Sequence, residues 1–193
     1  MKGRTGVRNY MYKTIEGIYG LRDADFRSTM ANLRRGVGHE PGEIPELLGY
    51  LLMSMPEEMM DSRGTATFEL RACYAALTLF AMHQQGHSQE ERMSKEGASL
   101  GSAVARLIGS DDEFSRVQGR FNTIATSDDL TELQYHFRTI VRMLSDKSLP
   151  VDYVQMAEDF YSYQFIENRP SIRLKWGQDF YRTVNKKEDK KDE

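Results

Sequence analysis

Apolar residues recur along most of the chain at intervals of three and four positions, which is the spacing of one face of an α-helix. No segment shows a convincing strand pattern, which would be a short run of alternating apolar and polar residues bounded by turn signals. We therefore predict an all-α protein. The predicted helices cover residues 23–36, 45–55, 65–85, 99–109, 110–124, 129–144, 152–164 and 170–180.

Helix start and stop signals accompany this periodicity. Ser110 with Glu113, and Asp129 with Glu132, have the spacing of capping boxes, and Pro45 is suited to the first turn of a helix. Asp23 or Asp25 is a candidate cap for the helix that follows it. Residues 65–85 carry apolar side chains around most of the helix circumference, which predicts a central helix surrounded by others.

Short helices with short connections are typical of bundles rather than of one long coiled coil. A boundary near Gly109 divides the chain into an N-terminal bundle, residues 1–109, and a C-terminal bundle, residues 110–185. Four lysines and four acids mix in residues 186–193, a composition that predicts a disordered tail.

The composition excludes several classes of protein. Hydrophobic residues make up 39% of the 193 positions and charged residues 28%, which is typical of a globular chain. No run approaches the roughly 20 apolar residues of a membrane span, and residues 1–20 lack the apolar core of a signal peptide. Cys73 is the single cysteine, so an internal disulfide is excluded. A reducing, cytoplasmic location and no membrane partner are expected.

The net charge of −3 hides a strongly uneven distribution. Residues 1–35 hold eight basic and three acidic side chains, whereas residues 36–64 hold six acidic side chains and one basic one. Arginines also occur as neighbours or one helical turn apart, so each pair can form a positive spot on its helix. Such spots suit phosphate, although solvated faces and intramolecular ion pairs explain them equally well. These pairs are Arg34 with Arg35, Arg116 with Arg120, and Arg138 with Arg142.

Catalytic patterns are weak. His83 and His87 are four residues apart with acids nearby, as in a helical metal site, but Gly86 separates them and Ser88 can cap a new helix. A structural or solvated role is therefore favoured over a metal-dependent hydrolase. Nucleophile-elbow, phosphate-loop, dinucleotide and CxxC motifs are absent from the sequence. No catalytic residue, metal ligand or cofactor is predicted.

Several segments, taken in order, resemble one known family. These are LRR at 33–35, YAALTLFAMHQQG at 74–86, SLG at 99–101, RF at 120–121 with Ser127, the helix 133–144, PVDY at 150–153 and WGQDFY at 176–181. The set is similar to the small subunit of the type I-E CRISPR surveillance complex Cascade, the CasB family. Residues before Asp23 and the charged tail match nothing in this pattern.

The resemblance implies a non-catalytic subunit of two small helical bundles, present in two copies in an RNA-guided antiviral complex. Its implied partners are the backbone subunits that hold the CRISPR RNA, the large subunit, a second copy of itself, and the target and displaced DNA strands, whose open R-loop it stabilises. The residues carried over for nucleic-acid binding are Arg34, Arg35, Arg120, Arg138 and Arg142, with Arg63 and Arg116 less firmly matched. The alternative is a helical adaptor that acts through protein–protein contacts alone, with the acidic stretch Glu40 to Asp61 as a docking surface.

Overall fold

The computed structural model describes residues 2–189, and its regular elements there are α-helices and short 3₁₀ turns. The one β-bridge in this range joins Ser94 and Val151. The predicted all-α class is confirmed for the described residues. The α-helices are α1 Lys2–Tyr19, α2 Asp23–Arg35, α3 Leu48–Leu52, α4 Phe68–His83, α5 Leu100–Arg106, α6 Asp111–Ala125, α7 Leu130–Asp146, α8 Tyr153–Tyr163 and α9 Arg169–Asp189.

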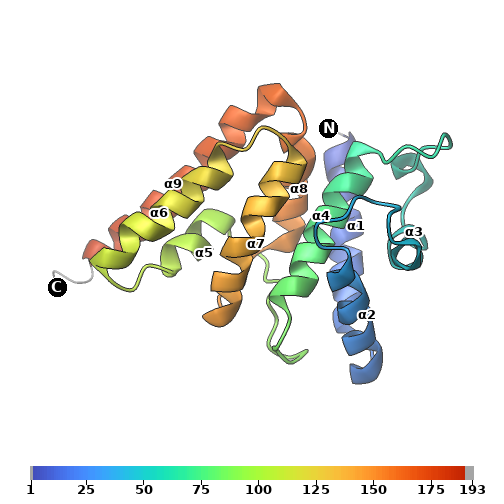
Figure 1. Cartoon of the computed structure of the whole chain (residues 1–193), viewed down its shortest axis with the longest axis horizontal. Helices are drawn as coiled ribbons and strands as arrows, with labels where there is room; N and C mark the ends of the chain where they lie inside the picture. Colours follow the sequence, from blue (N-terminus) through green and yellow to red (C-terminus); the bar gives the residue numbers. More distant parts are fainter. Residues whose placement is uncertain (1, 190–193) are drawn as a thin grey trace.

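Helix α4 is the centre of one half of the molecule, as its apolar circumference predicts. Most of its residues are buried, and α2, α7 and α8 pack around it. Helix α1 lies against both α4 and α8, and α3 lies at the far edge of this half (Figure 1). In the other half α5 packs along α9, and α6 packs against α7.

One hydrophobic core connects these helices. Its aromatic centre joins α7, α8 and α9, where the Phe137 ring meets Phe160 and Trp176 edge-on and Tyr163 stacks on Trp176. The indole N–H of Trp176 donates a 2.8 Å hydrogen bond to the buried carboxylate of Asp159. This bond satisfies a polar group that would otherwise be costly to bury.

Helices α5 and α9 approach each other unusually closely at Gly101. A Cβ atom placed on Gly101 would lie 2.1 Å from the Trp176 carbonyl oxygen and 2.7 Å from the Phe180 nitrogen. Only a residue without a side chain permits this approach, so the glycine sets how deeply α5 sits against α9.

Helix α1 is an element that the apolar periodicity did not predict. Its buried residues include Val7, Met11, Ile15 and Ile18, spaced four, four and three apart, and Tyr10 beside them is also part of the core. Beside this stripe Arg4 and Arg8, one helical turn apart, both donate to the carboxylate of Glu158 on α8, at 3.2 and 3.1 Å. The helix therefore docks on α8 through an apolar stripe and a charged clamp.

Several predicted boundaries differ from those observed. The residue before α2 is Arg22, so Asp23 is the first helical residue rather than the cap. The Asp129 side chain caps α7 as predicted, but the Ser110 hydroxyl makes no capping bond; instead Glu113 accepts a hydrogen bond from the Gly109 N–H. The segment predicted as 45–55 begins as a 3₁₀ turn, and its α-helix ends at Leu52.

Helix α9 continues to Asp189, which differs from the disorder predicted for residues 186–193; residues 190–193 lie outside the described part. The division at residue 109 stays a prediction, and many packed pairs cross it, including α5 with α9, α4 with α8, α1 with α8 and α4 with α7. No helix within residues 2–189 has both the length and the apolar character needed to cross a membrane.

Candidate nucleic-acid interface

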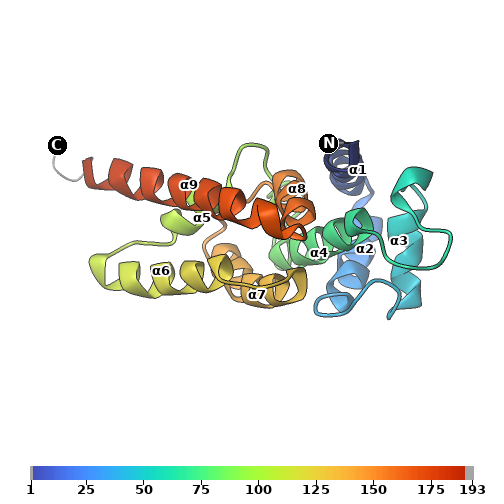
Figure 2. The same ribbon diagram turned by 90° about the horizontal axis from the view of Figure 1, so that it is seen from above.

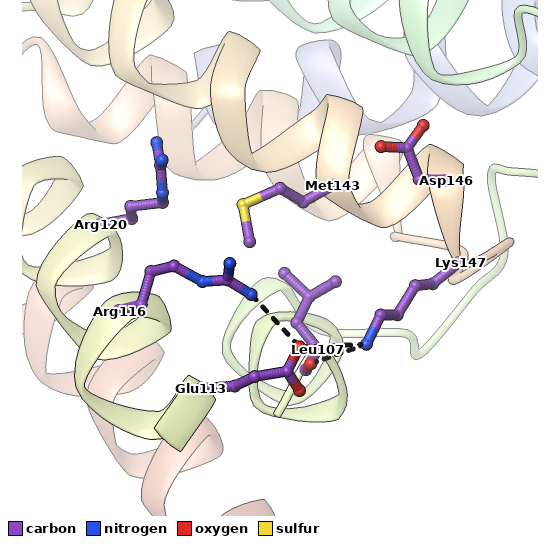
Figure 3. Close-up of a pocket in the computed structure, with 7 residues that line it drawn as sticks. All are labelled: Leu107, Glu113, Arg116, Arg120, Met143, Asp146 and Lys147. Carbon is purple, nitrogen blue, oxygen red and sulfur yellow. Dashed lines mark hydrogen bonds and ion pairs between the residues drawn. The ribbon is translucent and has the colours of Figure 1, made fainter. Parts of the chain in front are cut away.

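A surface hollow of about 250 Å³ separates α6 from the end of α7, and we refer to it as the α6–α7 hollow. Figure 3 shows that Arg116 and Arg120 reach it from α6, and that Lys147, the residue directly after α7, also lines it. Two carboxylates share the rim, so the basic groups outnumber the acidic ones by one. Its lining residues are Leu107, Glu113, Arg116, Arg120, Met143, Asp146 and Lys147.

Glu113 is the main internal counter-charge in the α6–α7 hollow. Its carboxylate lies 3.2 Å from the Arg116 guanidinium and 3.9 Å from Lys147 Nζ (Figure 3). The hydrogen bond from the Gly109 N–H, followed by the charge of Lys147, lowers the pKa of Glu113 and keeps it ionised. Arg116 is thus partly neutralised by its own helix.

Arg120 and Arg142 have no such counter-charge. Both are exposed, and neither forms an ion pair with any of the described residues. Arg120 follows Arg116 by one helical turn, and in Figure 3 its guanidinium points away from Glu113. Each therefore presents a full positive charge to solvent, where a phosphate can reach it.

Arg138 is held by the protein rather than by an acid. Its guanidinium stands over the Tyr135 ring, 5.3 Å from the centroid, and a Cβ on Gly38 would lie 3.0 Å from its terminal nitrogen. Its Nε atom is buried and has no hydrogen-bond partner. Gly38, which has a φ of +87°, lies in the loop after α2. The contact between Arg138 and Gly38 therefore joins α7 to the end of α2.

Arg34 and Arg35 end α2 and face different surroundings. Arg34 is half-buried without an ion pair to the described residues, and burial lowers the pKa of its guanidinium. It lines a groove of about 430 Å³ between α2 and residues 84–89. Arg35 is exposed and lies 3.8 Å from the Glu46 carboxylate, too far for a strong pair.

Arg63 is not brought to the other arginines. It donates to both carboxylate oxygens of Asp61, two residues earlier, and this bond lowers the pKa of the acid. Figure 1 shows the loop before α4, which holds both residues, at the end of the molecule opposite α6. Arg63 therefore pairs with an acid of its own loop and does not share a surface with the arginines of α6 and α7.

One group of cations does come together, and Arg138 has a different neighbour. Arg116, Arg120 and Lys147 share the α6–α7 hollow, and Arg138 reaches the loop that follows Arg35. Figure 2 shows α6 and α7 on one side of the molecule, with α9 on the other. Lys147 was missed by the sequence reasoning because it stands alone in the sequence. Its neighbours just after α7 are Asp146 and two serines, which carry no signal of the contact with α6.

The two histidines that suggested a metal site have other partners. The buried Nδ1 of His83 lies 3.0 Å from the Tyr153 hydroxyl, and burial lowers the pKa of His83 to about 4. His87 Nδ1 lies 3.2 Å from Glu91, and its Nε2 faces Ser145. Helix α4 ends between the two rings, and no helix begins at Ser88. Among the described residues no group of three or more potential metal ligands was found.

The fold gives the structural class of this protein, and comparison with known proteins gives its family. The fold and the α6–α7 hollow define a small all-α protein that gathers three cations in one surface hollow. The family model for the CRISPR-associated protein Cse2 matches residues 29–181, so the chain belongs to the Cse2 family. No curated protein sequence matches the chain significantly.

Solved structures agree with this assignment. The crystal structure of CasB from Thermobifida fusca is 26% identical, with a TM-score of 0.70, over 93% of this chain and 98% of that one. CasB from Thermus thermophilus is 17% identical, with a TM-score of 0.68, over 91% and 97% of the two chains. A chain of a CRISPR RNA-guided surveillance complex has the same fold, with 19% identity, a TM-score of 0.68 and coverage of 97% and 98%. The predicted family resemblance is confirmed.

Proposed function

We propose that this protein is a non-catalytic small subunit of a type I-E CRISPR RNA-guided surveillance complex and that its arginines contact the target and displaced DNA strands. Membership of the Cse2 family supports the first part, because a chain of the same fold occurs in such a complex. The observation that carries the second part is the pair of exposed arginines without counter-charge, Arg120 and Arg142, on neighbouring helices.

The chemistry of these groups suits a sugar–phosphate chain. A guanidinium donates two parallel hydrogen bonds to a phosphate, and each phosphate neutralised releases condensed counterions. Neither arginine is held in a pocket shaped for a base, so the contact carries charge without reading sequence. Cations that hold the displaced strand lower the free energy of the open R-loop relative to the reannealed duplex.

The partners and location follow from the same proposal. The protein would contact the backbone subunits that hold the CRISPR RNA, the large subunit and a second copy of itself, and would meet the RNA indirectly. A cytoplasmic location fits a complex that intercepts invading DNA. Its role is to hold strands and subunits in place, so no chemical step is assigned to it.

The first experiment measures binding of single-stranded DNA by the isolated protein at several salt concentrations, using fluorescence anisotropy. Replacing Arg120 and Arg142 by alanine removes two phosphate contacts, so the slope of log K against log[salt] should decrease by about 1.4. Arg182→Ala is the matched control, because Arg182 is similarly exposed but forms a 3.0 Å pair with Asp179 on α9. The control should bind as the wild type does.

The second experiment tests the R-loop directly. A complex reconstituted with the Arg120→Glu and Arg142→Glu double variant should assemble normally and form a shorter-lived R-loop than the complex with Arg182→Glu. Normal assembly with an unchanged R-loop lifetime and unchanged salt slope would show that these arginines do not hold DNA. The adaptor alternative, which acts through protein contacts alone, would then be the better explanation.

A further inference from the structure

Helix α3 has one open face that the nucleic-acid site does not use. Leu47 and Leu51 are buried on its inner side, whereas the Met53 side chain is 89% exposed on the outer side. Tyr50 precedes Met53 by one helical turn and is also exposed, and its hydroxyl accepts a 2.8 Å hydrogen bond from Asn32 on α2. Figure 1 places α3 at the edge of the molecule farthest from α6.

The outer side of α3 is also flat at one position. Gly49 is exposed, and nothing lies within 4 Å of a Cβ atom placed on it. A partner backbone can approach closely there, while the flexible thioether of Met53 adapts to the shape of what covers it. The fixed Tyr50 ring adds an aromatic surface that loses little freedom on binding.

Acidic residues flank this apolar strip along the chain. Glu46 lies one turn before Tyr50, and Glu57 and Glu58 follow Met53 after the Pro56 turn; all three are exposed. The nearest cation with a measured distance is Arg35, 3.8 Å from Glu46. Glu57 and Glu58 form no ion pair with any described residue. We call this surface the α3 face, and it consists of Glu46, Gly49, Tyr50, Met53, Glu57 and Glu58.

We propose that the α3 face docks a protein surface that carries lysine or arginine side chains around an apolar centre. Exposed acids repel a phosphate chain, so nucleic acid is the wrong occupant, whereas a basic protein surface matches both the charge and the apolar strip. Burial of Met53 and Tyr50 would supply affinity, and the acids would fix orientation and accelerate encounter. The partner is a protein subunit of the complex, so the inference rests on the proposed function.

This assignment gives the molecule two ends with different partners. The α6–α7 hollow presents cations at one end, and the α3 face presents carboxylates at the other. Such polarity orients the subunit, because the reversed orientation would place acids against DNA and arginines against a basic protein.

The test uses the purified RNA-bound complex of backbone and large subunits without the small subunit, and measures its affinity for the full-length protein by interferometry. Met53→Ala should weaken binding at least tenfold, and Glu57→Lys with Glu58→Lys should weaken binding and reduce its salt dependence. Ile166→Ala and Glu167→Lys are matched controls, since this pair offers an exposed apolar residue beside an exposed acid in the turn before α9. DNA affinity of every variant is measured in parallel.

Each outcome decides the question. Weaker binding by the α3-face variants, with normal binding by the controls and unchanged DNA affinity, supports the inference. Wild-type affinity of the α3-face variants overturns it while leaving the proposed function standing. Loss of self-association in sedimentation, with wild-type binding to the complex, overturns it in favour of a second copy as the occupant. Failure of the wild-type protein to bind the complex would instead refute the proposed function.

Discussion

Replacing Gly101 by alanine should separate α5 from α9. The added Cβ would lie 2.1 Å from the Trp176 carbonyl oxygen, and ordinary van der Waals contact requires at least 3.4 Å, so the helices must part by more than 1 Å. The obstructing atoms belong to the α9 backbone and cannot rotate away. Overpacking of this kind costs about 3 kcal/mol, and the better helix propensity of alanine returns about 1 kcal/mol. A net loss of about 2 kcal/mol is expected.

Urea denaturation followed by circular dichroism measures this loss as a lower midpoint at unchanged slope. Gly177→Ala is the control, because Gly177 lies in α9 beside Trp176 but nothing is within 4 Å of its Cβ. The same substitution should there stabilise the protein by about 0.5–1 kcal/mol. The change in the free energy of unfolding should therefore have opposite signs at the two glycines. A Gly101→Ala protein as stable as the wild type would show that α5 and α9 are not in backbone contact.

Two further predictions concern buried polar groups. Asp159→Ala removes the acceptor of the Trp176 indole N–H and of Lys175 Nζ, at 2.8 and 2.9 Å, and should lower the free energy of unfolding, measured by urea denaturation, by about 2–3 kcal/mol. Asp159→Asn keeps an acceptor for the indole and should lose clearly less stability. Equal losses for the two variants would contradict the role of the indole bond. The folded-state pKa of His83 is about 4, below its ordinary value of 6.5, so between these values the unfolded chain binds a proton that the folded chain does not. Stability should therefore decrease as the pH falls from 6.5 towards 4, by at most about 3 kcal/mol. Urea midpoints measured across this range should fall less steeply for His83→Phe, and an identical pH dependence would exclude His83 as the cause.

Most of the fold was predictable because the signals for it are local. The buried stripes of α2, α4 and α7 have regular helical spacing, and Asp129 caps α7 as its spacing with Glu132 predicts. Helix α1 was missed although Val7, Met11 and Ile15 show the same spacing. Its many charges and its glycines obscured the stripe, and no capping residue marks its start.

The candidate site was predictable only in part. Local ion pairs could have been found from sequence, since Asp61 and Glu113 lie two and three residues before the arginines that they neutralise. By contrast, Lys147 meets Arg116 and Arg120 only because α6 packs against α7, and Arg138 meets Gly38 across a hundred residues of chain. Contacts of this kind depend on tertiary packing, which residue spacing does not encode.

The clamp between α1 and α8 has a consequence for synthesis. Arg4 and Arg8 bind a carboxylate that follows them by 154 and 150 residues, so the first helix leaves the ribosome long before its docking partner is made. During that interval the part of its apolar stripe that α8 covers in the folded protein is open to chaperones or to neighbouring nascent chains. Slow translation or premature termination ahead of Glu158 should therefore promote aggregation of the nascent polypeptide more than the stability of the finished protein would indicate.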